Sequence, residues 1–245
     1  MSALNILSGG AAQGLVGSLA TELKQRTGLD ISGEFGAVGA MADKLRSGAP
    51  TDILVLTSAL IATLAGEKLV DSASIKDVGR VETALAVRSA DPLVSAGDAA
   101  SLRAVFLAAD SIFVPDTKAS TAGIHVAKVL QQLGVADEVA SRLKIYPNGA
   151  TAMRHMAESD AKRPIGCTQA TEIIATKGIQ LSGALPAGCD LATIYTAAVT
   201  KKAVHAHEAQ VLIDLLTAAD RRPFRERAGF LPGRLEDQTS DRVGL

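Results

Sequence analysis

The sequence predicts an α/β fold in which mostly parallel strands are flanked by helices. Short apolar runs of β type alternate with longer segments of helical periodicity, which is the pattern of βαβ units. The first sixty residues already hold three such strands, at 4–7, 30–35 and 52–57. The short spacing between these strands leaves room only for tight right-handed crossovers.

Helices in the N-terminal part end at glycine or proline. After the turn Ser8-Gly9-Gly10, leucines at 15, 19 and 23 recur at helical spacing until Thr27-Gly28 ends the helix. Gly48-Ala49-Pro50 ends a second helix. The expected elements are helices at about 40–46 and 58–65, followed by strands at 81–88 and 111–115.

The C-terminal part continues the alternation of strands and helices. A helix over 121–133 places Val126, Val129 and Leu130 on one face. Met153 and Met156, three positions apart, indicate the buried face of another helix. The remaining expected elements are strands at 142–147, 164–169 and 194–200, and helices from about 172 and over 208–219.

Composition and charge exclude several classes of protein. The chain has 245 residues, of which 47% are hydrophobic, so it can bury a large core and is not a disordered chain. Its 25 Lys and Arg residues are balanced by 26 Asp and Glu residues. Because there is no positive excess to neutralise phosphates or anionic lipids, we expect no nucleic-acid partner and no membrane-surface binding.

The first twenty-one residues carry no charged side chain, yet they do not have the pattern of a targeting segment. An export signal begins with a basic region, and here no Lys or Arg precedes Lys24. Glycines at 9, 10, 14 and 17 also interrupt the apolar run, which is too short to span a membrane. We therefore expect a cytoplasmic protein with no membrane insertion and no membrane transporter as its partner.

No metal or nucleotide motif is present in the sequence. Cys167 and Cys189 lie twenty-two positions apart, which is not the spacing of metal ligands, so we expect buried free thiols. The glycine-rich segment 8–14 contains no P-loop lysine, and its glycines do not have the spacing of a dinucleotide fingerprint. We therefore expect neither a metal nor a cofactor.

Four predicted strand-to-helix junctions carry small or hydroxyl side chains. Ligands of open α/β sheets bind where strand ends lead into helix N-termini, because free amides and the helix dipole meet there. Such junctions favour a small anion, although small residues at these turns also serve ordinary turn chemistry. The junctions are Ser8–Ala11, Gly36–Gly39, Thr117–Thr121 and Thr168–Glu172.

Several phrases of the sequence together carry a family resemblance. They are LNILSGGAAQGL (4–15), KLRSGAPTDILVLTS (44–58), AGIHVAKVLQQLG (122–134), PIGCTQATEI (164–173), TKGIQL (176–181) and RAGF (227–230). With them, the chain from about Leu4 to Phe230 resembles the type 2 periplasmic binding protein fold. Within that fold it resembles the molybdate-binding-protein-like substrate-binding proteins of ABC transporters.

The resemblance implies a specific organisation of the chain. It implies two α/β lobes, each a mostly parallel sheet flanked by helices, with a small anion bound in the cleft between them. Residues 1–82 and 196–245 would form the first lobe, and residues 83–195 the second.

The sequence departs from the molybdate binders at the ligand. By the resemblance, those proteins hold their oxyanion with serines on the first two loops and a tyrosine after the late strand. Here the matching positions are Ala11, the stretch 37–39 and Gln169. Each lost hydroxyl removes a charge-assisted hydrogen bond worth about 1.5–3 kcal/mol, so we expect molybdate not to bind.

We expect instead a small di- or tricarboxylate, bound as by a solute-binding protein. Open helix N-termini supply donors and a positive field to a carboxylate without arginine. The candidate ligand-binding residues are Ser8, Gly9, Gly10, Ala11, Val38, Gly39, Thr117, Lys118, Ser120, Thr121, Gly149 and Gln169.

An alternative function is an isomerase. The chain also resembles aconitate isomerases, which are similar to the same molybdate binders, through 36–40, 121–125 and 169–172. That resemblance implies a metal-free 1,3-proton shift on a small polycarboxylate. A base and donors for a developing enolate-like carboxylate are needed, and His125 and Glu172 are the candidate catalytic residues.

Each candidate also has an ordinary structural interpretation. Thr117, Ser120 and Thr121 are typical helix-capping residues, and Lys118 can be a solvated loop lysine. His125 can be a core or rim histidine. Glu172 lies at a helix start, where the helix dipole favours acidic residues without any further role.

Overall fold

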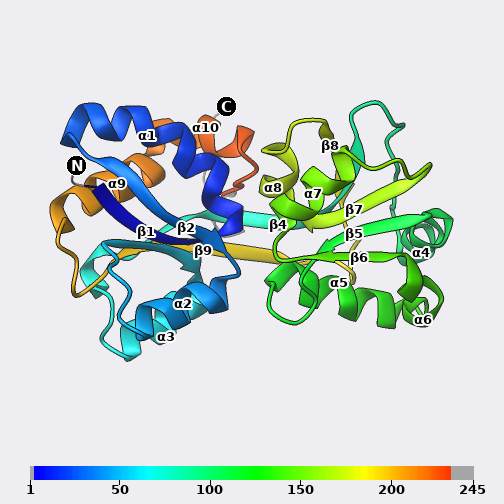
Figure 1. Ribbon diagram of the computed structural model, residues 1–245, viewed down its shortest axis with the longest axis horizontal. Coiled ribbons are helices and arrows are strands. Elements are labelled where there is room, and N and C mark those ends of the chain that lie inside the picture. Colours follow the sequence, from blue (N-terminus) through cyan, green and yellow to red (C-terminus); the bar gives the residue numbers. More distant parts are fainter. Residues whose placement is uncertain (1–2, 233–245) are drawn as a thin grey trace, which may run out of the picture. The chain divides into compact units, whose positions relative to one another are not determined.

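The computed structural model describes residues 3–232 and divides the chain into two compact units (Figure 1). The first unit combines the chain up to Val81 with the chain from Thr193 onward, and the second is Glu82–Ala192. The outermost residues of the predicted first lobe, 1–2 and 233–245, lie outside the described residues. Among the described helices, none has the length and apolar character needed to cross a membrane.

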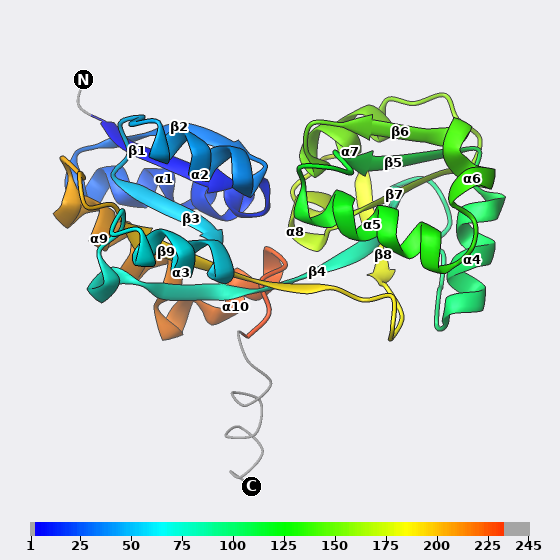
Figure 2. The same ribbon diagram turned by 90° about the horizontal axis from the view of Figure 1, so that it is seen from below.

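The first unit contains a mixed sheet with the strand order β2-β1-β3-β9, next to which β4 follows. Strand β1 is parallel to both β2 and β3, with β1 and β2 visibly side by side in Figure 2, and β9 is antiparallel to β3. The bounds are β1 Ala3–Gly9, β2 Asp30–Gly36, β3 Ile53–Thr57, β4 Lys76–Arg88 and β9 Ala192–Val199.

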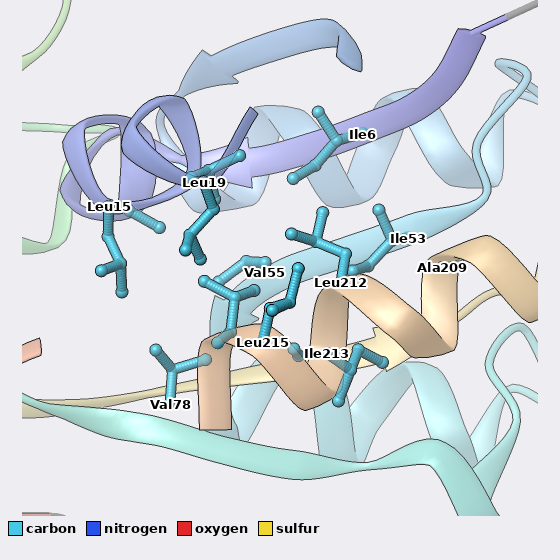
Figure 3. Close-up of a cluster of buried hydrophobic side chains, with 14 of the residues drawn as sticks. Ile6, Leu15, Leu19, Ile53, Val55, Val78, Ala209, Leu212, Ile213 and Leu215 are labelled. Carbon is cyan, nitrogen blue, oxygen red and sulfur yellow. The ribbon is translucent and has the colours of Figure 1, made fainter. Parts of the chain in front are cut away.

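Helices cover both faces of this sheet because its side chains alternate in direction. Ile53 and Val55 of β3 point to a core that includes Leu15 and Leu19 of α1 and Leu212 of α9 (Figure 3). Leu54 and Leu56 point to a second core with α2 and α3. The bounds are α1 Gln13–Thr27, α2 Val38–Arg46, α3 Ser58–Gly66, α9 Ala206–Thr217 and α10 Arg222–Arg227, with 3-10 turns at Gly10–Ala12, Ser72–Ser74 and Ala219–Arg221.

A buried aspartate joins the two distant parts of the first unit. Asp52 is 1% exposed, and its carboxylate accepts the main-chain amide of Asn5 in β1 at 2.8 Å. It also accepts the amides of Val204 and His205, just before α9, at 2.7 and 3.0 Å. A buried carboxylate is tolerated only where donors replace water, and here the donors come from both parts of the chain.

The second unit contains the strand order β4-β7-β5-β6, and β8 pairs with β4. Strand β5 is parallel to β6 and β7, whereas β4 is antiparallel to β7. The ends of β5, β6 and β7 therefore lie at one edge of the sheet and their beginnings at the other. The bounds are β5 Ser111–Pro115, β6 Leu143–Tyr146, β7 Pro164–Gln169 and β8 Ile179–Ala184.

This sheet is also covered on both faces. Ile112 and Val114 of β5 lie in a core with Phe106 of α4 and Val126 of α5, while Phe113 packs with Met153 of α7 on the other face. The bounds are α4 Ala99–Ala108, α5 Thr121–Gln132, α6 Ala136–Val139, α7 Gly149–Ala157 and α8 Ala170–Ile174, with a 3-10 turn at Ala140–Arg142. The predicted α/β class is confirmed, and β5 and β7 coincide with the strands expected from the sequence.

Several elements differ from the sequence-based expectation, which included neither α6 nor α10. Strand β4 begins at Lys76 rather than at residue 81. The helix expected from about 172 is the five-residue α8, and β8 was not expected at all. In β8, half-exposed polar and glycine residues interrupt the apolar alternation by which a strand is predicted from sequence. This segment is a strand because it pairs with β4.

We predict that Asp52→Ala lowers the free energy of unfolding by about 2–4 kcal/mol, because it leaves buried amides without an acceptor. Urea unfolding at neutral pH measures the change. Asp214→Ala is the control, because it removes the exposed ion pair with Lys76 and an exposed hydrogen bond from Gln210, and it should cost less than about 1 kcal/mol. Equal effects of the two substitutions would contradict the role given to Asp52.

Candidate functional site

In the first unit, the predicted anion-binding residues lie where β1, β2 and β3 end. Gly9 and Gly36 are partners in the parallel register of β1 and β2, which places the first two predicted junctions side by side. Helices α1, α2 and α3 begin at this edge, and no side chain caps any of them. Their first amides are therefore not satisfied by a capping side chain.

The side chains of Tyr195 and Val38 approach the main chain of Gly9 closely. A Cβ atom built on Gly9 would lie 2.8 Å from Cε1 of Tyr195 and 2.9 Å from Cγ1 of Val38, so only glycine permits this approach. Tyr195, the fourth residue of β9 and the register partner of Thr57, was not among the predicted site residues. Its ring also packs edge-on against Phe230, with ring centroids 6.3 Å apart.

The other predicted residues of this edge differ in exposure. Ser8 is fully buried and its hydroxyl donates to the carbonyl of Gly9 at 2.9 Å, so its side chain serves the main chain. Ala11 is buried, Gly10 is half-buried and Gly39 is exposed.

In the second unit, the turn between β5 and α5 presents a helix N-terminus without a side-chain cap. Ser120 is the N-cap residue, and its hydroxyl makes no capping hydrogen bond. Asp116 accepts instead the amides of Lys118 and Ala119 at 2.7 and 3.0 Å, and these two amides hold its pKa below the usual range. A Cβ atom on Gly123 would collide with the carbonyls of Pro115 and Asp116. Glycine at this position therefore allows the first turn of α5 to pack closely on the end of β5.

Four predicted side chains surround this N-terminus. Thr117, Ser120 and Thr121 are half-buried and Lys118 is exposed. Within residues 3–232, none of these four side chains hydrogen-bonds to another protein group, and Lys118 is attracted to the nearby Asp116 carboxylate. Three hydroxyls, one ammonium group and the first-turn amides of α5 are thus available to an anion.

The neighbouring helices α4 and α7 are capped by their own side chains. At α4, Asp98 accepts the amide of Ser101 at 2.7 Å in a reciprocal capping box. At α7, Asn148 accepts the amide of Thr151 at 2.8 Å. Of the three longer helices in this unit, α5 is therefore the one with an open N-terminus.

The side chain of Glu172 also occupies the N-terminus of α7. The residue is 7% exposed, and its carboxylate accepts the Thr168 hydroxyl at 2.6 Å and the amides of Gly149, Ala150 and Gln169. Gly149 is required here, because a Cβ atom would occupy the position of the carboxylate oxygen. Burial raises the pKa of Glu172 despite these donors.

His125 is held by the loop before β9. Its Nε2 lies 2.8 Å from the carbonyl oxygen of Cys189, and Gln132, two turns later on α5, donates to the carbonyl of Gly188 at 3.0 Å. With Nε2 engaged as a donor, Nδ1 is the nitrogen left for another partner. His125 and Glu172 therefore have different hydrogen-bond partners within the second unit.

Gln169 faces Thr83 across β7 and β4. The two residues are register partners, and Gln169 is 3% exposed. Strand alternation places both side chains on the sheet face that α4 and α5 cover, because Cys167 and Leu85 belong to that core. Gln169 Oε1, Thr83 Oγ1 and the neighbouring Thr171 Oγ1 are buried without a partner among the described residues.

The two cysteines are free and buried, as the sequence predicts. Burial raises the pKa of Cys167 to about 12, so its thiol is neutral and unreactive at neutral pH. Within residues 3–232, no cluster of His, Cys, Asp and Glu is arranged to hold a metal ion.

Comparison with known proteins matches nearly the whole chain to one family. The model of the family described as bacterial extracellular solute-binding proteins matches residues 4–231. An aconitate isomerase of Pseudomonas sp. is 24% identical over 243 residues, which cover 95% of this chain and 88% of that protein.

Two solved structures show the same fold at low identity. The periplasmic molybdate-binding protein of Azotobacter vinelandii has a TM-score of 0.76 at 16% identity, covering 94% of this chain and all of that one. PEB3 bound to L-phospholactate has a TM-score of 0.66 at 16% identity, covering 93% of this chain and 99% of that one.

We predict that Glu172 makes stability depend on pH. Because burial raises its pKa, Glu172 ionises at a higher pH in the folded protein than in the unfolded chain. Relative to Glu172→Gln, the wild-type protein should lose free energy of unfolding as the pH rises above about 4.3, the ordinary glutamate value. The loss is about 1.4 kcal/mol for each pH unit over which only the unfolded state ionises.

Urea unfolding of both proteins between pH 4 and 8 measures this difference. Glu138→Gln on α6 is the matched control, since Glu138 is exposed. Parallel pH profiles for the wild type and Glu172→Gln would contradict the prediction.

Proposed function

Because the chain belongs to the family of bacterial extracellular solute-binding proteins, we propose that it binds a small di- or tricarboxylate. The observation that carries this proposal is the open N-terminus of α5, surrounded by Thr117, Lys118, Ser120 and Thr121. Amides, hydroxyls and one ammonium group are the donors that a carboxylate needs.

The main-chain amides at the start of α7 are already used within the protein, which supports α5 rather than α7 as the ligand-binding helix. The amides of α7 already hold the Glu172 carboxylate, whereas those of α5 hold no side chain of the described residues. In the first unit, the uncapped starts of α1 and α2 near Gly9 and Val38 offer a similar set of amides without hydroxyl side chains.

The side chains favour a carboxylate over a tetrahedral oxyanion. Ala11 and Val38 offer no hydroxyl where molybdate binders are expected to carry serines. The names of two similar proteins, an aconitate isomerase and a phospholactate-bound PEB3, also point to small carboxylic acids.

We predict that citrate or trans-aconitate binds, whereas molybdate and tungstate at sub-millimolar concentration do not. A ligand at 100 times its Kd should stabilise the folded protein by about 2.7 kcal/mol, which thermal-shift screening detects and calorimetry then quantifies. Lys118→Ala and Thr121→Val should each weaken the best ligand by about fivefold or more, since each removes a charge-assisted hydrogen bond.

Lys128→Ala, an exposed lysine later on α5, is the matched control and should leave the affinity unchanged. If Lys118→Ala and Thr121→Val both stay within about twofold of the wild type, the ligand is not at this helix. Micromolar binding of molybdate would overturn the carboxylate assignment.

The similarity to an aconitate isomerase favours a second candidate, a metal-free 1,3-proton shift on a polycarboxylate. In this reaction a base removes a proton from the methylene carbon, the double bond moves by one position, and a proton returns two bonds away. His125, through Nδ1, and Glu172, whose pKa is raised by burial, remain the candidate bases.

For this candidate we predict that the protein converts trans-aconitate in D₂O with deuterium incorporation, followed by NMR of the vinyl and methylene signals. Replacing the base, by His125→Ala or Glu172→Gln, should lower kcat by about 10²–10⁴-fold while binding survives. No conversion leaves the binding function alone. Activity that survives both substitutions would remove both residues from the mechanism.

A further inference from the structure

The second unit contains a pocket at the opposite edge of its sheet from the α5 N-terminus. The pocket has a volume of about 500 Å³ and lies between α4, the end of β4 and the start of β7. Pro164 and Ile165 of β7 line it, whereas the predicted ligand-binding residue Gln169 is at the other end of that strand. Five residue steps along a strand separate the two positions by about 16 Å.

The walls of this pocket are apolar. Helix α4 buries Leu102 and Phe106 in the core, and turns Ala104, Val105 and Ala108 toward the pocket. These positions recur at helical spacing, and their small side chains leave the space open. The buried side chains of Val87 and Ile165 complete the lining from the two strands.

One wall is a loop that β8 holds in place. Ser182 donates to the carbonyl of Val94 and accepts its amide, both at 2.8 Å. Gln180 donates to the carbonyl of Asp91 at 3.0 Å. Between these anchors Leu93 is 61% exposed, although it lines the pocket. The loop is therefore fixed with a large apolar side chain in contact with water, which an apolar ligand in the pocket would cover.

The charged residues of the lining leave a positive excess. Asp91 is neutralised by Arg88, whose Nε donates to its carboxylate at 2.7 Å. Lys162 and Arg163 are exposed, and within the described residues their side chains form no ion pair. Asp110, the acidic group beside them, accepts their main-chain amides at 2.8 and 3.2 Å and so fixes the backbone that carries both cations.

We propose that this pocket binds a medium-chain carboxylate, with its hydrocarbon chain between α4 and the loop and its carboxylate at Lys162 and Arg163. The volume lies within the range of about 300–1,000 Å³ that is usual for small-molecule pockets. The lining matches such a ligand, because it is apolar inside and carries two cations and no unpaired lining anion. The site is separate from the carboxylate site proposed at α5.

Calorimetric titration of the full chain with decanoate and with decan-1-ol tests the proposal. We expect decanoate to bind with a Kd below about 0.1 mM and decan-1-ol more weakly. The double substitution Lys162→Ala/Arg163→Ala should weaken decanoate by about tenfold and leave decan-1-ol within about twofold. Ala108→Phe, which fills the pocket from an exposed position, should weaken both by at least about tenfold.

Lys128→Ala is the matched control and should change neither affinity. Saturating citrate should not displace decanoate, which separates this site from the one at α5. If Ala108→Phe does not fold, Ala104→Phe fills the same pocket from the preceding turn. The proposal is wrong if decanoate does not bind at about 1 mM, if citrate displaces it, or if pocket filling leaves its affinity unchanged.

Discussion

The buried carboxylate of Glu172 determines how the second unit can present its helix ends. A carboxyl group this deeply buried requires several hydrogen-bond donors, and it accepts the Thr168 hydroxyl and the first amides of α7. This arrangement in turn requires a residue without a side chain at Gly149. One internal carboxyl group thereby joins β7, α7 and α8. Because Asp98 caps α4, α5 is the one of the three longer helices in this unit without a side-chain cap.

The two units use the same geometry with different chemistry. In each, parallel strands end at one edge and helices begin there, so that main-chain amides gather at the edge. The first unit surrounds these amides with Gly9, Val38 and the ring of Tyr195. The second unit adds hydroxyls and Lys118 around α5. Main-chain donors are thus common to both units, and Lys118 distinguishes the second.

Much of the fold follows from local sequence, whereas the candidate site follows only in part. Strands β5 and β7 are predictable because their apolar runs are bounded by turn residues. The open N-terminus of α5 is not predictable, since hydroxyls such as Ser120 can serve the helix or a ligand, and only coordinates show which. Tyr195 and Thr83 have no local signal at all, because they reach Gly9 and Gln169 through long-range strand pairing.

The position of β9 between β3 and β4 has a consequence for biosynthesis. The nascent chain completes Glu82–Ala192 before β9 leaves the ribosome, so the first unit waits with the edges of β3 and β4 unpaired. At about 5–20 residues per second, the 118 residues from 82 to 199 take about 6–24 s to make. Exposed strand edges promote aggregation. The speed of translation over this interval therefore sets how long these two strand edges stay unpaired.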